Sequence, residues 1–273
     1  MEAKFSNSPH LSQFETAGAL QRVVLLGASN LSLTFPMVVE TALDVFGRPL
    51  EFFIAMGFGR SYGRESKFFR KNFSGILQSR LWDALDGARP LATVAVAADI
   101  GNDVPYEVPV STIVESVKQT LDALDERGVQ VVLNNIPLPS IRSLSPARYA
   151  LMRRILFPRS RMSHGELMHR AEELSAALEV MAAERQTPIF TGENSWYGFD
   201  PIHPRRKWAG EIWQRMFTAV SPESRPVVLR APARRDARIL RRLQSRAWFE
   251  LSQRGGATVV SERLPDGTSI ALF

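Results

Sequence analysis

Short apolar runs alternate with segments of helical periodicity along most of this 273-residue chain, and this alternation constrains the fold more than any other feature. Val23 to Leu26 is a continuous apolar run closed by a glycine, and Leu91 to Ala98 is a second run, apolar except for Thr93. Runs of this kind are typical of strands buried on both faces of a parallel sheet. The sequence therefore predicts an α/β fold.

The same alternation places five strands and the helices between them. The strand candidates are 23–26, 50–55, 91–98, 129–133 and 188–190, and the helix candidates are 34–46, 110–126, 146–157, 163–185 and 205–218. Strands that alternate with helices at this spacing predict a parallel sheet covered by helices on both faces.

The composition changes after Pro222. Nine arginines and two acidic residues lie between Arg225 and Arg254, so this segment carries +7 and the rest of the chain about −1. A helix is expected over 232–252, followed by a β-hairpin whose turn is 264–267. We predict three parts: a loose lead-in over 1–20, a main domain over 21–222, and a basic helix-and-hairpin appendage over 223–273.

Two interpretations of the basic helix are open. Its leucines 240, 243 and 251 can pack on the main domain while its arginines stay solvated, which is the interpretation we favour. The alternative is an anionic partner, either a phosphate group or a membrane surface. The main domain has no basic excess, so no nucleic-acid partner is expected.

Several classes of protein are disfavoured by composition. The chain has no cysteine, which excludes disulfides, a thiolate nucleophile and cysteine-based metal sites. No apolar run approaches the roughly 18 residues of a membrane span, and the first residues do not resemble a secretory signal, so a cytoplasmic location is expected. His164 and His169 are five apart and do not form a zinc motif, and Gly57 to Tyr62 lacks the last glycine of a dinucleotide loop. We therefore expect no metal and no organic cofactor.

Four polar blocks carry the candidate chemistry. They are Gly27-Ala28-Ser29-Asn30, Gly57-Phe58-Gly59-Arg60-Ser61, Gly101-Asn102-Asp103 and Asp200-Pro201-Ile202-His203. Three residues, Ser29, Gly59 and Asn102, each lie just past the carboxyl end of a predicted strand. The carboxyl ends of parallel strands share one edge of the sheet, where ligands bind in such folds.

Each block has a chemical and a purely structural interpretation. A carboxylate at Asp200 can accept the Nδ1 proton of His203 and leave Nε2 as a base, whereas the structural alternative is a solvated histidine in a loop. Ser29 is either an exposed nucleophile or a helix cap. Asn102 is either an oxyanion donor or an Asx-turn residue, and Asp99 before it is expected to order the loop.

The four blocks in this order resemble those of the SGNH (GDSL-type) hydrolases, over roughly residues 20–220. The resemblance implies a three-layer α/β/α sandwich with a five-stranded parallel sheet of the flavodoxin-like kind. It also implies that Ser29 is the nucleophile, His203 the base and Asp200 its orienting partner. Gly59, with Gly57 as second choice, and Asn102 would form an oxyanion hole with the backbone N–H of Ser29. Ala28 departs from the pattern, since the family usually has an aspartate there.

The leading hypothesis from these residues is a serine ester hydrolase that works through an acyl-serine intermediate on a small-molecule or glycan ester. Phe58, Arg60, Tyr62 and Trp196 are candidate substrate-binding residues, with ordinary packing as the alternative for the aromatic ones. A second hypothesis is an O-acyltransferase or deacetylase acting on a cytoplasmic metabolite or glycan. A third is a non-catalytic binding protein that keeps the SGNH fold.

Overall fold

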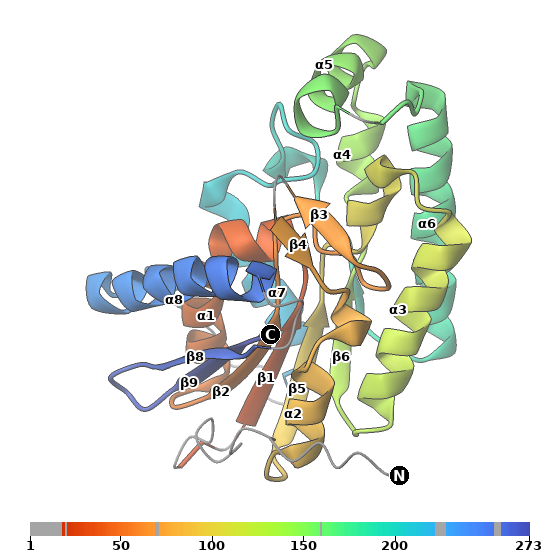
Figure 1. Cartoon of the computed structure of the whole chain (residues 1–273). Coiled ribbons are helices and arrows are strands. Elements are labelled where there is room, and N and C mark those ends of the chain that lie inside the picture. Colours follow the sequence, from red (N-terminus) through yellow and green to blue (C-terminus); the bar gives the residue numbers. More distant parts are fainter. Residues whose placement is uncertain (1–17, 20, 69–70, 159, 222–227, 254–257) are drawn as a thin grey trace.

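One mixed sheet of seven strands forms the centre of the structure within the described part of the chain (Figure 1). This computed structural model describes residues 18–19, 21–68, 71–158, 160–221, 228–253 and 258–273. Across the sheet the strands are β7 (Ile189–Phe190), β6 (Gln130–Asn134), β5 (Ala92–Ala97), β1 (Gln21–Leu26), β2 (Glu51–Ala55), β9 (Ser269–Leu272) and β8 (Val260–Arg263). All neighbours are parallel except β8, which is antiparallel to β9.

The register of the three central strands determines where the loops emerge. Leu26 at the end of β1 is level with Ala55 of β2 and Ala97 of β5. The ladder continues one step further, because Gly27 N–H donates to the carbonyl of Ala55 and Ala98 N–H donates to that of Leu26. The segments that follow β1, β2 and β5 therefore leave the sheet side by side at one edge.

Helices cover both faces of the sheet, which makes three layers. One face carries α1 (Ser29–Phe46), α7 (Arg206–Ala219) and α8 (Arg234–Gln253). The other carries α2 (Leu81–Gly87), α3 (Val110–Asp125) and α6 (His164–Glu184). The predicted α/β fold with a parallel sheet covered on both faces is confirmed.

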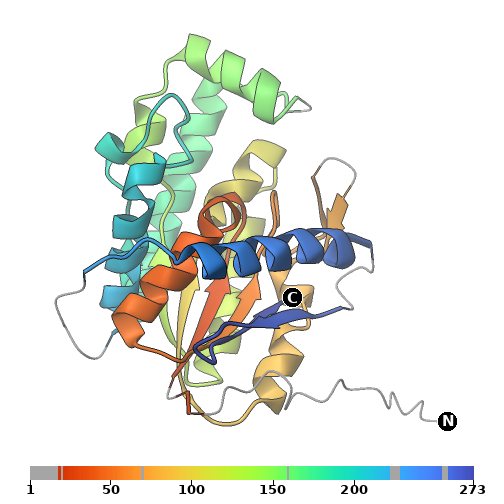
Figure 2. The ribbon, with the colours of Figure 1, turned by 90° about the vertical axis from the view of Figure 1, so that its left-hand side faces the viewer.

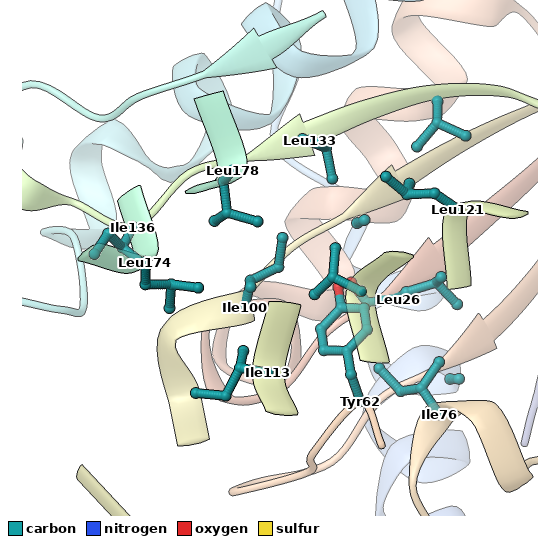
Figure 3. Packing of buried hydrophobic residues seen from close by; sticks show 14 of the residues in the cluster. Leu26, Tyr62, Ile76, Ile100, Ile113, Leu121, Leu133, Ile136, Leu174 and Leu178 are labelled. Carbon is teal, nitrogen blue, oxygen red and sulfur yellow. The ribbon is translucent and has the colours of Figure 1, made fainter. Parts of the chain in front are cut away.

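The two faces bury separate apolar clusters, because side chains alternate between the faces along each strand. Leu26 and Leu133 point toward α3 and α6, where they meet Leu121, Leu174 and Leu178 (Figure 3). Burying a leucine of this kind contributes about 1.5–3 kcal/mol to folding. The amphipathic periodicity of α3 and α6 therefore determines which of their sides faces the sheet.

The sheet has seven strands, so the expectation of five is wrong. The five predicted strands are present in the flavodoxin-like order, and the C-terminal hairpin adds two more. Ser269 N–H donates to the carbonyl of Leu50, and Phe273 N–H donates to that of Ile54. The hairpin itself was recognisable from its turn, but its pairing with β2, more than 200 positions away, has no local signal.

The basic helix α8 lies across α1, as the view in Figure 2 shows. Its leucines 240, 243 and 251 are buried in the same cluster as α1 and β2, whereas its arginines are exposed. The predicted packing of the leucines on the main domain is confirmed, and it leaves the arginine side chains exposed.

Some elements had no counterpart in the sequence prediction. They are the short strands β3 (Ser66–Phe68) and β4 (Lys71–Phe73), helix α2, helix α4 (Leu138–Arg142) and a 3₁₀ segment over Ile100–Tyr106. Helix α5 (Pro146–Leu156) lies at its predicted position. The lead-in predicted over 1–20 falls almost wholly outside the described residues. Within the residues that are described, no helix is both long enough and apolar enough to cross a membrane.

Candidate active site

Ser29, His203 and Asp200 form a continuous hydrogen-bonded chain. Ser29 is the first residue of α1, immediately after the carboxyl end of β1, and His203 lies in the loop before α7. The Oγ of Ser29 lies 2.8 Å from Nε2 of His203. The Nδ1 of His203 lies 2.6 Å from Oδ2 of Asp200. The hydroxyl, the imidazole and the carboxylate are therefore aligned for proton transfer from serine to histidine.

The loop before α7 holds the carboxylate in place. The Oδ1 of Asp200 accepts the backbone N–H groups of Ile202 and His203, at 3.0 and 3.1 Å. With Oδ1 occupied in this way, Oδ2 is directed at the imidazole. Because Asp200 and His203 are three residues apart, the backbone between them forms a turn that Asp200 itself stabilises. This turn holds the carboxylate and the imidazole in contact before any substrate binds.

The pKa values of the pair shift in opposite directions. Burial by itself lowers the pKa of His203, but the hydrogen bond and negative charge of Asp200, with a further contribution from Asp99, raise it above its usual value. Burial by itself raises the pKa of Asp200, but the hydrogen bond and charge of His203 and the two backbone N–H groups lower it below the usual value. The site therefore stabilises an imidazolium beside a carboxylate, which is the charge state that forms when His203 takes a proton from Ser29.

Asp99 connects the serine segment to the end of β5. Its Oδ2 accepts the N–H of Ala28 at 2.6 Å and that of Leu31 at 3.3 Å, so it caps the start of α1. Its Oδ1 accepts the side-chain amide of Asn30 at 2.7 Å. Gly27 permits this approach, because a Cβ there would lie 3.1 Å from Oδ2 of Asp99.

Asn30 joins the two halves of the site. Besides Asp99, its amide donates to the carbonyl of Ile202 at 3.1 Å, in the loop that holds His203. The sequence predicts that Asp99 orders its loop, but it indicates no role for Asn30. The only local signal for Asn30 is its position next to Ser29, because its partners lie about 70 and 170 positions away.

Asn102 and Ser29 line the same cavity, whereas Gly59 lies in a neighbouring hollow. The Nδ2 of Asn102 donates to the carbonyl of Arg60 at 3.2 Å, which ties it to the turn that contains Gly59. Gly59 has a positive φ of 70°, and a Cβ there would lie 3.2 Å from the hydroxyl of Tyr106. Glycine is therefore required at position 59 by the backbone and by the close approach of Tyr106. Gly57, the second choice, lines a third hollow beside α8.

Arg60, a candidate substrate-binding residue by sequence, has its side chain buried within the protein. It is 2% exposed, and its guanidinium donates to the carbonyls of Ser74, Met56 and Phe273. Burial lowers its pKa to about 10. The side chain links the turn after β2 to the C-terminal strand.

The three aromatic candidates also pack within the protein. Tyr62 is buried in the cluster of Figure 3 and donates to the carbonyl of Ala98 at 2.8 Å. Trp196 is 2% exposed and stacks on Phe190. Phe58 packs on Phe68 and Trp248 beside α8. None of them is among the residues that line the cavity beside Ser29, and their role as substrate-binding residues stays a prediction.

The cavity beside Ser29 has a volume of about 120 Å³. Polar residues line part of it, among them Ser29, Asn102, Asn134, Asn135 and Arg153. Apolar residues form most of the rest of the lining, namely Ile136, Ile141, Leu144, Met152, Leu156, Phe157, Leu167 and Ala171. Sequence patterns could not reveal this cavity, because its lining residues come from segments that are distant in the chain.

No cluster of three or more histidine, aspartate or glutamate side chains within the described ranges is arranged to hold a metal ion.

Comparison with known proteins gives matches in structure only. No family model matches the chain, and no curated protein matches it. One solved structure matches with a TM-score of 0.50 at 14% identity, over 74% of this chain and 96% of the other. An aryl esterase of M. smegmatis matches with a TM-score of 0.49 at 12% identity, over 73% and 98% of the two chains. The protein TesA matches with a TM-score of 0.48 at 17% identity, over 74% and 99%.

The sheet order and the match at a TM-score of 0.50 show a three-layer α/β/α fold with a flavodoxin-like order of its parallel strands. At such low identity the likeness establishes the fold and leaves the activity to be argued from the site.

Proposed function

We propose that the protein is a serine ester hydrolase that works through an acyl-serine intermediate. The observation that supports this most directly is the 2.8 Å contact between Ser29 Oγ and His203 Nε2, with Asp200 on the other ring nitrogen. A hydroxyl, an imidazole and a carboxylate in this order form the arrangement that activates a serine for attack on a carbonyl.

In the proposed reaction, His203 accepts the proton of Ser29 as Oγ attacks the carbonyl carbon of the ester. The imidazolium, stabilised by Asp200, then protonates the leaving oxygen or sulfur. The acyl group remains on Ser29 until a water molecule, deprotonated by His203, releases it as the free acid. When the acid leaves, the imidazolium of His203 returns its proton to Oγ of Ser29, so the complete cycle restores the enzyme.

The negative oxygen of the tetrahedral intermediate needs hydrogen-bond donors. Ser29 lies at the N-terminus of α1, where N–H groups have no acceptor within the helix and the helix dipole is positive. The side-chain amide of Asn102 lines the same cavity. We assign the oxyanion hole to the N–H of Ser29 and the amide of Asn102, with the N–H of Gly59 as the third expected donor.

The cavity favours an acyl group with a hydrocarbon chain. Its lining is mostly apolar, although Asn134, Asn135 and Arg153 also line it, so each methylene that packs on the apolar part contributes about 0.8 kcal/mol. The hydroxyl groups of a sugar would lose hydrogen bonds there. We therefore place a hydrophobic acyl chain in the cavity rather than a glycan. An O-acyltransferase would share the acyl-serine step, and product analysis in the presence of candidate alcohols separates the two.

The test uses a fluorophosphonate probe and p-nitrophenyl esters from acetate to dodecanoate. Wild type should be labelled at Ser29 and should hydrolyse the esters. Ser29→Ala should lose both properties, whereas Ser111→Ala, an exposed serine on α3, should keep both. Labelling or turnover that survives in Ser29→Ala at the wild-type level would rule out the proposal.

A further inference from the structure

A groove lined by arginines runs beside the candidate active site, between α1, α7 and α8. Helix α8 contributes Arg234, Arg238 and Arg241, which recur at helical spacing on one of its sides, and α7 contributes Arg206 at its first position. The opposite wall is formed by residues 33–37 of α1. The leucines of α8 are buried beneath, so the helix is held in place while these guanidinium groups face the groove.

Within the described ranges, the guanidinium groups of these four arginines form no ion pair and no hydrogen bond with a protein group. This differs from much of the molecule, where arginines such as Arg127 and Arg185 are paired with aspartates. Four unneutralised cations around one groove produce a local positive potential that attracts anions.

The groove starts close to the proposed nucleophile. Leu33 follows Ser29 by four residues, so the two share one side of α1 and are separated by about 6 Å along its axis. Arg206 follows His203 by three residues. The apolar cavity extends the other way, toward α4, α5 and α6. Ser29 therefore lies between an apolar cavity and a cationic groove.

We infer that the groove binds phosphate groups on the alcohol or thiol portion of the acylated substrate, the portion that leaves when Ser29 is acylated. This inference rests on the proposed esterase function. A guanidinium group is planar, so it can donate two parallel hydrogen bonds to two oxygens of one phosphate. The ammonium group of a lysine lacks this geometry. Arg234 and Arg241 are about 10 Å apart along α8, which suits more than one phosphate, as in a nucleoside diphosphate. The shared chemistry is a phosphorylated leaving group, carried either by a soluble nucleotide or by a lipid headgroup.

The experiment compares phosphorylated substrates with neutral ones that carry the same acyl chain. The nucleotide arm uses lauroyl coenzyme A against lauroyl N-acetylcysteamine. The lipid arm uses lauroyl lysophosphatidylglycerol against 1-lauroylglycerol, both below their micelle concentrations. The groove variant is Arg238→Gln/Arg241→Gln, and the matched control is Arg235→Gln/Arg242→Gln, which removes the same charge from exposed positions of α8 outside the groove.

In the groove variant, KM for one of the phosphorylated substrates should rise about tenfold, as expected for the loss of two partly exposed charged contacts. The neutral substrates should be unaffected, and the control should behave as wild type. A rise in KM for the coenzyme A thioester identifies a soluble nucleotide as the source of the phosphate, and a rise in KM for the lysophospholipid identifies a lipid headgroup. Equal effects in both variants, or no effect in either arm, would overturn the inference.

Failure of the proposed function is distinguishable from failure of the groove. If wild type hydrolyses none of the four substrates, the esterase proposal fails, and calorimetry with inorganic pyrophosphate then tests the groove alone. Binding that is lost in the groove variant and in Arg206→Gln but kept in the control supports the site. Pyrophosphate that binds all variants equally, or does not bind wild type, refutes it.

Discussion

Replacing Asp99 by asparagine is expected to destabilise the first turn of α1 and to lower the pKa of His203. The carboxylate accepts Ala28 and Leu31 N–H on one oxygen and the Asn30 amide on the other. An asparagine has only one acceptor oxygen, so its NH₂ group must face one of these donor sets. A hydrogen bond to a charged group contributes about 1.5–3 kcal/mol, so losing at least one of them should lower the free energy of unfolding by about 2–3 kcal/mol.

The same substitution should move the pH dependence of hydrolysis. His203 acts as a base only when neutral, so activity falls as the pH drops through its pKa. The negative charge of Asp99 contributes to raising that pKa, and its removal should shift the acid limb of kcat/KM toward lower pH.

Urea unfolding and a pH profile with p-nitrophenyl decanoate measure the two effects of Asp99→Asn. Glu126→Gln, an exposed residue at the end of α3, serves as a control with the same change of charge. A change in unfolding free energy below about 0.5 kcal/mol, together with an unmoved acid limb, would refute the assignment of Asp99 as both cap and positioning charge.

Three further predictions follow from the geometry. Asp200→Asn should lower kcat by about 10³- to 10⁴-fold, because the imidazole loses the partner that fixes its tautomer, and steady-state hydrolysis measures this. Ala171→Phe should fill the cavity and reduce kcat/KM for decanoate far more than for acetate, and equal losses for both esters would contradict the placement of the acyl chain. Glu51→Gln should lower the free energy of unfolding by about 3–5 kcal/mol, because it leaves Arg22 buried without its carboxylate at 2.9 Å, and denaturant titration tests this.

The parts of the site that the sequence predicted are those with local patterns. Ser29 and Asn102 follow apolar strands whose carboxyl ends must meet at one sheet edge, and the register of β1 with β5 brings them together there. The spacing of Asp200 and His203 lies within a single turn of chain, so residue type and distance in sequence sufficed to predict their contact.

What the sequence did not predict depends on contacts between distant segments. Arg60 is a candidate substrate-binding residue by sequence, yet its guanidinium is buried and donates to three carbonyls, one of them that of Phe273. The strands β3 and β4 have three residues each, too few for a periodic pattern to emerge. The cavity and the arginine groove form only where helices from distant parts of the chain pack together, so no local sequence pattern indicates them.

The departure at position 28 and the carboxylate at position 99 are best understood as one arrangement. Ala28 is 1% exposed, and its N–H lies 2.6 Å from Oδ2 of Asp99. An aspartate at position 28, as the SGNH pattern usually has, would bury a second carboxylate against the first, and like charges at that distance cannot both stay ionised without cost.

The start of α1 has no side-chain cap of its own from Ala28. The negative charge that a helix N-terminus favours is supplied instead from the end of β5, 71 positions later, by a residue that also orients Asn30 and acts on His203. A small uncharged side chain at position 28 therefore fits beside Asp99, and alanine removes no group that the proposed chemistry uses.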